Sequence, residues 1–190
     1  MSQTTPTWEA LYGLAAVQEG HFTTKQAAEA GYSLPLIAKY LASGRVVRIR
    51  RNIYRLVHFP PGEHEDLSVL WLWSDRKGVF SHQTALSLHE LSDVLPGRTH
   101  LTVPLSWKTR RLRIPEGLVL HYGDFAASEK TWVGSIPVTA ARRALSDCVD
   151  ARVSPEIVGK ALSDALRRGL VVRDEMKPVS RYLARFERTK

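Results

Sequence analysis

A sequence of 190 residues is long enough for two small domains, and its 44% hydrophobic and 24% charged residues are typical of a folded protein. Its 27 Lys and Arg residues exceed its 19 Asp and Glu residues, and the net charge of +8 favours a polyanionic partner such as nucleic acid. The single cysteine, Cys148, excludes an intrachain disulfide and a zinc site built from cysteines. Because the sequence lacks a signal-peptide pattern and an apolar window that could span a bilayer, we expect a cytoplasmic protein.

Apolar residues at helical spacing predict three short helices near the N-terminus, each followed by a glycine. The helices are expected at about residues 8–19, 24–30 and 34–43. The third helix is expected to turn four apolar side chains inward: Leu34, Ile37, Ala38 and Leu41. Because the second and third helices are joined through a glycine, they predict a helix-turn-helix unit.

The stretch RVVRIRRNIYRL, residues 45–56, contains five arginines and no acid. Its alternating apolar residues predict two strands, at about 46–50 and 53–56, joined at a turn that includes Asn52. Strict alternation would place Val47 and Ile49 toward the core and Arg48 and Arg50 on the opposite face. A hairpin in this position predicts a winged helix-turn-helix.

Two interpretations of this hairpin are open. It is either the exposed edge of a three-helix bundle, kept soluble by its arginines, or a wing whose arginines contact phosphates. The clustering of arginines directly after a helix-turn-helix pattern favours the second interpretation. The DNA-binding residues predicted on this basis are Lys25, Gln26, Ser33, Pro35, Lys39, Tyr40, Arg48, Arg50, Arg51 and Asn52.

The segment HFPPGEHED predicts a joint after the hairpin, and the composition changes beyond it. We therefore expect a winged helix-turn-helix domain in residues 1–58 and a mixed α/β domain in residues 59–190, an α+β fold overall. In the second part, strands are expected at HLTVPL, LVLHY and IPVT, with a short strand entering a helix at VFSHQTALSLHEL. Further helices are expected at 65–74, after a Thr139 cap, from Ser154 to Gly169, and at 174–190.

An enzyme would have to be built on residues such as Ser81, His82, His89 and Asp147. The two histidines are seven positions apart, which differs from the i, i+4 pair of common zinc motifs, and no nucleophile elbow or phosphate-binding loop is present. We predict no catalytic residue, no cofactor and no metal site. A metal-dependent nuclease or other hydrolase acting on nucleic acid is the alternative, and an adaptor that binds RNA or protein through its basic surface is a third.

The run GHFTTKQAAEAGYSLPLIAKYLASGRVVRIRRNIYRL resembles the N-terminal winged helix of the AbiEi family of antitoxins, which belong to type IV toxin–antitoxin and phage-abortive systems. The resemblance rests on the following residues: Phe22-Thr23, Ala27-Ala28, Gly31, Ser33, the basic residues from Arg48 to Arg51, and Tyr54. The family often has glycine at the wing tip, where this chain has Asn52.

Three later segments, FSHQTALSLHELSD, HLTVP and IPVTAARRALSDCVD, resemble the family's C-terminal region. The resemblance implies an antitoxin that represses its own promoter by binding inverted repeats in double-stranded DNA. It also implies a C-terminal antitoxin domain that counters a nucleotidyltransferase-like toxin, with direct contact between the two proteins left open.

Overall fold

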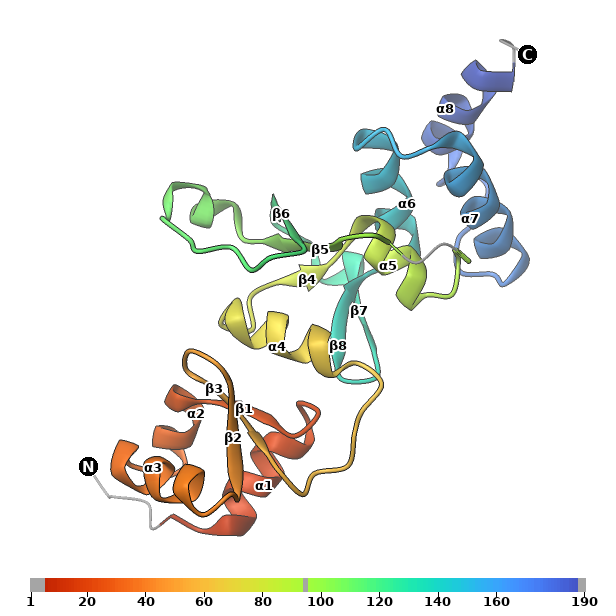
Figure 1. The fold of residues 1–190 in the computed structure, drawn as a ribbon. Helices are drawn as coiled ribbons and strands as arrows, with labels where there is room; N and C mark the ends of the chain where they lie inside the picture. The colour runs from red at the N-terminus through yellow and green to blue at the C-terminus, as the bar shows by residue number, and fades with distance from the viewer. Residues whose placement is uncertain (1–5, 94–95, 188–190) are drawn as a thin grey trace. The chain divides into compact units, whose positions relative to one another are not determined.

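The computed structural model of the chain describes residues 6–93 and 96–187 and has the predicted α+β fold (Figure 1). The chain forms two compact units, Met1–Arg76 and Lys77–Lys190. The first unit contains three helices, a small sheet and a fourth helix, and the second contains a five-stranded sheet with helices. None of the helices in the described ranges combines the length and the apolarity that crossing a membrane requires.

The N-terminal unit confirms the three predicted helices and both strands of the hairpin. Its elements are α1 (Trp8–Ala16), β1 (His21–Thr23), α2 (Thr24–Glu29), α3 (Leu34–Ala42), β2 (Val46–Arg50), β3 (Ile53–Leu56) and α4 (Glu65–Trp73). Strand β1, which the sequence pattern did not predict, pairs with β3, and the antiparallel order is β1-β3-β2. Helix α4 packs against β1 and β3, so the compact unit extends beyond the hairpin to Arg76.

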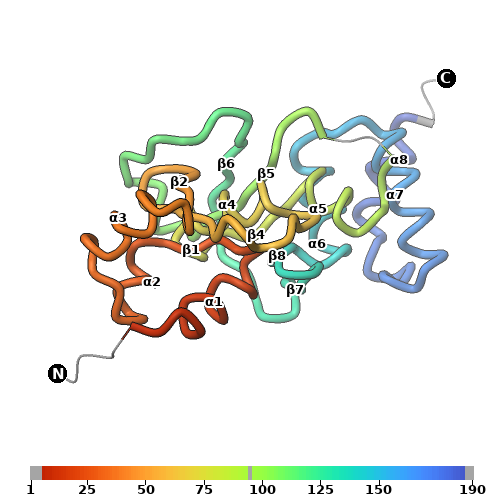
Figure 2. The backbone as a smooth tube through the Cα atoms, turned by 60° about the horizontal axis from the view of Figure 1, so that its bottom comes forward, coloured from red at the N-terminus to blue at the C-terminus, as the bar shows by residue number. Residues whose placement is uncertain are grey.

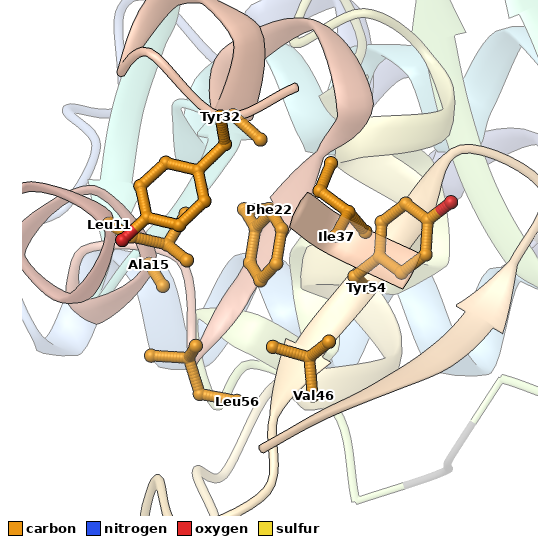
Figure 3. Close-up of a cluster of buried hydrophobic side chains, with 9 residues drawn as sticks. Leu11, Ala15, Phe22, Tyr32, Ile37, Val46, Tyr54 and Leu56 are labelled. Atoms are coloured by element: carbon orange, nitrogen blue, oxygen red, sulfur yellow. The ribbon is translucent and has the colours of Figure 1, made fainter. Parts of the chain in front are cut away.

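Buried side chains from the three helices and the sheet form the main core of this unit (Figure 3). At its centre the rings of Phe22 and Tyr54, from paired strands, stack with their centroids 5.7 Å apart. The other members of the core include Leu11, Ala15, Tyr32, Ile37, Val46 and Leu56. Because these residues come from α1, α3 and all three strands, the core fixes α3 against the base of the hairpin.

Local hydrogen bonds set the ends of α2. The Thr23 hydroxyl accepts the N–H of Gln26, and the Gln26 side chain accepts the N–H of Thr23, which is a capping box. At the other end Gly31 has φ 86°, and the N–H of Tyr32 donates to Ala27 O at 2.8 Å. This arrangement is a Schellman motif, and it turns the chain from α2 into α3.

The hairpin differs from the predicted alternation. A bulge interrupts the β2–β3 register between Arg48 and Arg50, and Val46, rather than Val47 or Ile49, enters the core. Val47 and Ile49 are each 42% exposed, so their predicted inward position is wrong. Cross-strand partners share a face, and the pairing of Arg48 with Tyr54 therefore puts Arg48 on the helix side of the sheet, beyond the edge of the core. Because the register shifts at the bulge, Arg50 pairs with Ile53, the residue next to Tyr54 on β3.

Helix α3 is also turned differently from the prediction. Ile37 is buried and Leu41 is half-buried, as predicted, but Leu34 is 64% exposed and Ala38 is exposed as well. The inward positions are filled instead by Leu36 and Tyr40, which pack against the main core. Positions 38 and 40 lie about 200° apart around the helix, so the orientation that packs the large ring of Tyr40 on the core exposes Ala38.

The face of the sheet opposite the main core is covered by α4. Ile53 packs there with Val69 and Leu72, whereas its neighbour Tyr54 points into the main core. The Ser68 hydroxyl donates to Gln18 O at 2.8 Å, and Arg55 and Glu65 form an ion pair at 2.6 Å. Burial is the largest single influence on the pKa of Glu65 and raises it, but the hydrogen bonds from Arg55 and the Gly62 N–H, together with the charges of Arg55 and His21, outweigh burial, and the net pKa is lowered. The ion pair therefore forms at neutral pH.

The C-terminal unit has a mixed sheet in the order β6-β5-β4-β8-β7. Its elements are β4 (Val79–Phe80), α5 (His82–Leu88), β5 (Thr99–Val103), β6 (Leu118–Tyr122), β7 (Lys130–Val133), β8 (Ile136–Thr139), α6 (Ala141–Asp150), α7 (Pro155–Arg167) and α8 (Lys177–Glu187), with short 3₁₀ turns at Leu105–Thr109 and Ala127–Glu129. Strands β5 and β6 are parallel, as are β4 and β8, while the other two pairs are antiparallel. Helix α5 packs against α6, β5 and β8.

The predicted elements of this unit are confirmed, although the last helix begins at Lys177 rather than at residue 174, and its predicted residues 188–190 lie outside the described residues. Strand β7 was not predicted, because three of its four residues are exposed and carry no buried alternation. The prediction of a Thr139 cap is wrong: the cap position of α6 is Ala140, and Thr139 ends the buried strand β8. Ser154 does occupy the cap position of α7, but its hydroxyl donates to Glu156 rather than accepting a backbone N–H.

Gly20 is expected to be essential for stability. Its φ is 79°, and a Cβ there would lie 2.7 Å from two ring atoms of Phe59. The left-handed backbone and the steric clash together predict that Gly20→Ala lowers the free energy of unfolding by about 2–4 kcal/mol. Urea unfolding followed by circular dichroism measures this loss.

Gly13→Ala is the matched control: a Cβ at this position in α1 meets nothing within 4 Å. It should leave stability unchanged or raise it by about 0.5–1 kcal/mol. Equal losses in the two variants would contradict the packing argument.

His21 predicts a dependence of stability on pH. It is buried on the α4 side of the sheet, and burial lowers its pKa, with Arg55 acting in the same direction against the opposing hydrogen bond to Gln18 O. The unfolded chain, with a histidine pKa of about 6.5, binds the proton more readily than the folded chain. The stability contributed by neutral His21 is therefore present above about pH 6.5 and is lost as the pH falls below it.

Urea unfolding at pH 5, 6, 7 and 8 should show this decline in the native protein. His21→Asn retains an N–H donor and does not titrate, so it should reduce the decline. His58→Gln, a change at an exposed histidine, should leave the decline as it is. If the His21 and His58 variants follow the same pH profile, His21 is not the group responsible.

Candidate nucleic-acid interface

The segment between Glu29 and Glu63 contains six Lys and Arg residues and no Asp or Glu. One of the six, Arg55, is paired with Glu65 and faces α4. The other five are exposed and form no ion pair with the described residues: Lys39, Arg45, Arg48, Arg50 and Arg51. We call these five residues the cationic surface. Because no carboxylate neutralises them, their charge is available to an anionic partner.

The cationic surface is held by contacts between α3 and the hairpin, which we call the wing. Helix α3 and strand β2 lie side by side in two views (Figures 1 and 2). They are joined through Gly44, with φ 70°, and Arg45, whose N–H donates to Tyr40 O at 3.0 Å. The Arg45 guanidinium lies 5.4 Å from the centre of the Tyr40 ring. Arg45, which the predicted site omitted, therefore has a defined position between helix and wing.

The turn of the wing is anchored to the helix-turn-helix. Asn52 has φ 64°, the left-handed conformation expected for it, and its carbonyl accepts the N–H of Thr24 at 3.0 Å. This hydrogen bond joins the wing tip to the first turn of α2. Arg51 is exposed at the same turn, and Arg48 donates from Nε to Arg50 O at 3.4 Å. The structure thus brings Arg48, Arg50, Arg51 and Asn52 together on one short hairpin.

The exposed face of α3 is small and largely apolar. It presents five side chains to solvent: Leu34, Pro35, Ala38, Lys39 and Ala42. Lys39 is the one charged residue in this helix. Ser33, also exposed, caps the helix by accepting the N–H of Leu36 at 3.4 Å. A face of this kind can enter a groove closely, and its apolar groups match thymine methyl groups better than hydrogen-bonding base edges.

Two predicted DNA-binding residues have structural roles. Gln26 is 4% exposed; besides the capping box, its Nε2 donates to Gln18 Oε1 at 2.7 Å. Tyr40 is half-buried, with its ring centroid 5.7 Å from that of Trp8 and 5.8 Å from that of Tyr32. Burial, and then the adjacent Tyr40, raise the pKa of Tyr32 to about 12. The burial of Gln26 leaves it no access to DNA, whereas Tyr40 is partly exposed and Lys25 is exposed on α2, and a DNA contact by these two residues stays a prediction.

The residues considered for an enzyme do not converge on one accessible point. The Ser81 hydroxyl lies 2.7 Å from Thr102 Oγ1 and 2.9 Å from His82 Nδ1, but Ser81 is 0% exposed, so a substrate cannot reach it. His89 Nε2 contacts Thr139 O at 2.8 Å. Asp147 accepts from Arg143 Nε at 2.7 Å. Ser81 and His82 are thus neighbours in space, while His89 and Asp147 make separate contacts.

A comparison with known families covers the region that holds the cationic surface. Residues 14–57 match the family described as transcriptional regulator, AbiEi antitoxin. The match includes the whole of α2, α3 and the wing. It confirms the resemblance to AbiEi antitoxin regulators in the N-terminal region. The resemblance of the C-terminal segments stays a prediction.

One solved structure aligns with most of the chain at low similarity. The chain aligns with the crystal structure of the RV2827C protein from Mycobacterium tuberculosis at 17% sequence identity and a TM-score of 0.43. The alignment covers 96% of this chain and 78% of that chain. No curated protein matches the sequence.

The exposed arginines of the wing predict a specific salt dependence. If Arg48 and Arg50 contact phosphates, Arg48→Ala with Arg50→Ala removes two released counterions. The slope of log Kd against log salt concentration should then fall by about 2 units, with affinity reduced for all duplex sequences alike. Fluorescence anisotropy with a labelled duplex at several salt concentrations measures the slope.

Arg173→Ala with Arg181→Ala removes the same charge from exposed sites in the C-terminal unit and should leave the slope nearly unchanged. Equal slopes for the native protein and the wing variant would exclude the wing from the interface.

Proposed function

We propose that this protein is a DNA-binding antitoxin that represses its own promoter and counteracts a nucleotidyltransferase-like toxin. The observation that supports DNA binding best is the cationic surface: five exposed, unneutralised Lys and Arg residues on α3 and the wing. This surface lies within the region that matches the AbiEi regulators. The toxin and the autorepression, in contrast, are proposed from the family resemblance alone.

In this proposal α3 lies in the major groove and the wing follows the phosphate backbone. A helix-turn-helix places its second helix against base edges, and α3 has the exposed, narrow face that this requires. Lys39 is the group on that face that can donate to guanine, while Leu34 and Ala38 are suited to thymine methyl groups. Arg48, Arg50 and Arg51 supply most of the affinity through phosphates and little sequence information.

Inverted repeats would be bound by two copies of the chain, one on each half-site. The half-sites of such operators lie about 34–36 Å apart, one turn of the duplex, or a multiple of that distance. Each copy would present the same α3 face and wing to its half-site. The palindrome therefore follows from two-fold symmetry between the copies rather than from any feature of a single chain.

The two activities are expected to be separable, because the cationic surface lies in the first unit and the segments that resemble the antitoxin region lie in the second. Arg48→Ala with Arg50→Ala should relieve repression of a reporter placed behind the chain's own upstream region. The same variant should still protect cells that express the neighbouring toxin gene from a separate inducible promoter. Reporter output and colony counts on inducer are the two measurements.

Arg173→Ala with Arg181→Ala serves again as the charge-matched control for repression. Repression by the wing variant at the native level would contradict a DNA-binding role for the wing. Failure of the native protein to protect against the toxin would contradict the antitoxin role and leave the DNA-binding role standing.

A further inference from the structure

Three histidines that are far apart in the sequence meet in the C-terminal unit. His82 begins α5, His100 lies on β5 and His121 lies on β6, and one nitrogen of each lies within 4.8 Å of the others. The rings of His82 and His121 stack with their centroids 3.7 Å apart, and His100 Nδ1 lies 2.9 Å from His121 Nε2. We call these three residues the histidine cluster.

The sheet register accounts for this convergence. In the parallel β5–β6 pair Thr102 lies beside His121, and His100 is two residues from Thr102, so all three point to the same face. Leu101, between them, points to the other face and is buried in the core. The start of α5 is held next to this face because Ser81 N–H donates to His100 O at 3.1 Å and His100 N–H donates to the Thr84 hydroxyl at 2.8 Å.

The histidines of the cluster are neutral near pH 7. Burial, followed by the proximity of His121 and His100, lowers the pKa of His82 to about 3, and burial lowers that of His121 to about 4. Burial and Arg98 lower the pKa of His100 as well. Arg143 also faces His82, but it is paired with Asp147 and Glu129.

The surroundings of His82 resemble the support that metal-binding histidines usually have. Its Nδ1 lies 2.9 Å from the buried Ser81 hydroxyl, which in turn lies 2.7 Å from Thr102 Oγ1. A hydrogen bond of this kind from one ring nitrogen fixes the ring and directs the lone pair of the other nitrogen toward a metal.

We propose that His82, His100 and His121 bind a divalent transition-metal ion, of which zinc is the best fit, and leave one position for a fourth ligand. Three neutral imidazoles suit zinc, copper and nickel, whereas magnesium and calcium prefer oxygen ligands. Zinc–nitrogen bonds of about 2.0–2.1 Å in a tetrahedron place the nitrogens about 3.4 Å apart. The observed nitrogens lie within 4.8 Å of one another, with one pair at 2.9 Å. Because the three rings are nearly parallel, with interplanar angles of 15–24°, metal binding requires them to turn until their in-plane lone pairs meet at the ion.

Two alternative explanations of the cluster are less complete. A purely structural packing of histidines accounts for the stacking and the low pKa values, but it does not require three nitrogens to converge on one point. A serine–histidine catalytic pair accounts for the contact between Ser81 and His82, but Ser81 is buried and contacts Thr102. The metal site accounts for the proximity of the three nitrogens and for the hydrogen bond to Ser81 together. It is independent of the proposed DNA-binding and antitoxin functions.

The test is a titration of the full-length protein, prepared without a histidine tag and treated with a chelator, with Zn²⁺ at neutral pH in a calorimeter. We expect one Zn²⁺ per chain and an increase in the thermal unfolding temperature on its addition. The absorption spectrum of the Co²⁺-loaded protein should have the intensity of tetrahedral coordination. His100→Gln and His121→Gln should each weaken Zn²⁺ binding by more than about 100-fold, and Ser81→Ala by about 10-fold.

His58→Gln, which alters an exposed histidine in the other unit, is the control and should bind Zn²⁺ like the native protein. Circular dichroism establishes that each variant is folded, and both substituted positions, His100 and His121, are half-buried whereas His82 is buried. Absence of stoichiometric Zn²⁺ binding to the native protein would overturn the proposal. Binding that is as tight in the folded His100 and His121 variants as in the native protein would also overturn it.

Discussion

Strand β3 is the element on which the N-terminal unit depends, because its alternate side chains enter two separate cores. Tyr54 and Leu56 pack with the helices of the helix-turn-helix, while Ile53 packs under α4. A strand that is buried on both faces cannot slip by one residue without exchanging the two sets of side chains. The position of the wing relative to α3 is therefore fixed from both sides of the sheet, and the cationic surface is rigid at its base.

The N-terminal unit was largely predictable because its signals are local. Glycines after the helices, threonine and serine caps, and the Asn52 turn act within a few residues, and the structure has all of them where the sequence places them. What failed was the assignment of faces. Leu34, Val47 and Ile49 are apolar yet exposed, because a nine-residue helix and a two-stranded wing extend beyond the core that could cover them. The prediction of an exposed Gln26 failed for the opposite reason, because a polar side chain can be buried once its hydrogen bonds are made.

In the C-terminal unit the secondary structure was predictable from the sequence, but the histidine cluster was not. Its helices and most of its strands follow from periodicity, but the histidine cluster depends on parallel pairing between β5 and β6 and on the fold that brings α5 to them. Spacing arguments examine ligands on one helix, and they find only His82 and His89, which contact different groups. The placement of each histidine inside a predicted strand or at a helix start was visible, but the register that joins them was not.

The position of β2 at the edge of its sheet has a consequence for self-association. An edge strand exposes unpaired backbone groups to which a strand of another molecule can add, and Val47 and Ile49 would make such an addition more favourable here. Two copies that met along β2 would bring Arg48 and Arg50 of each copy together, and the like charges would repel. The two interpretations of the arginine-rich hairpin are thus compatible: the side chains suited to attract a duplex also keep the chains from aggregating through their sheets when no duplex is bound.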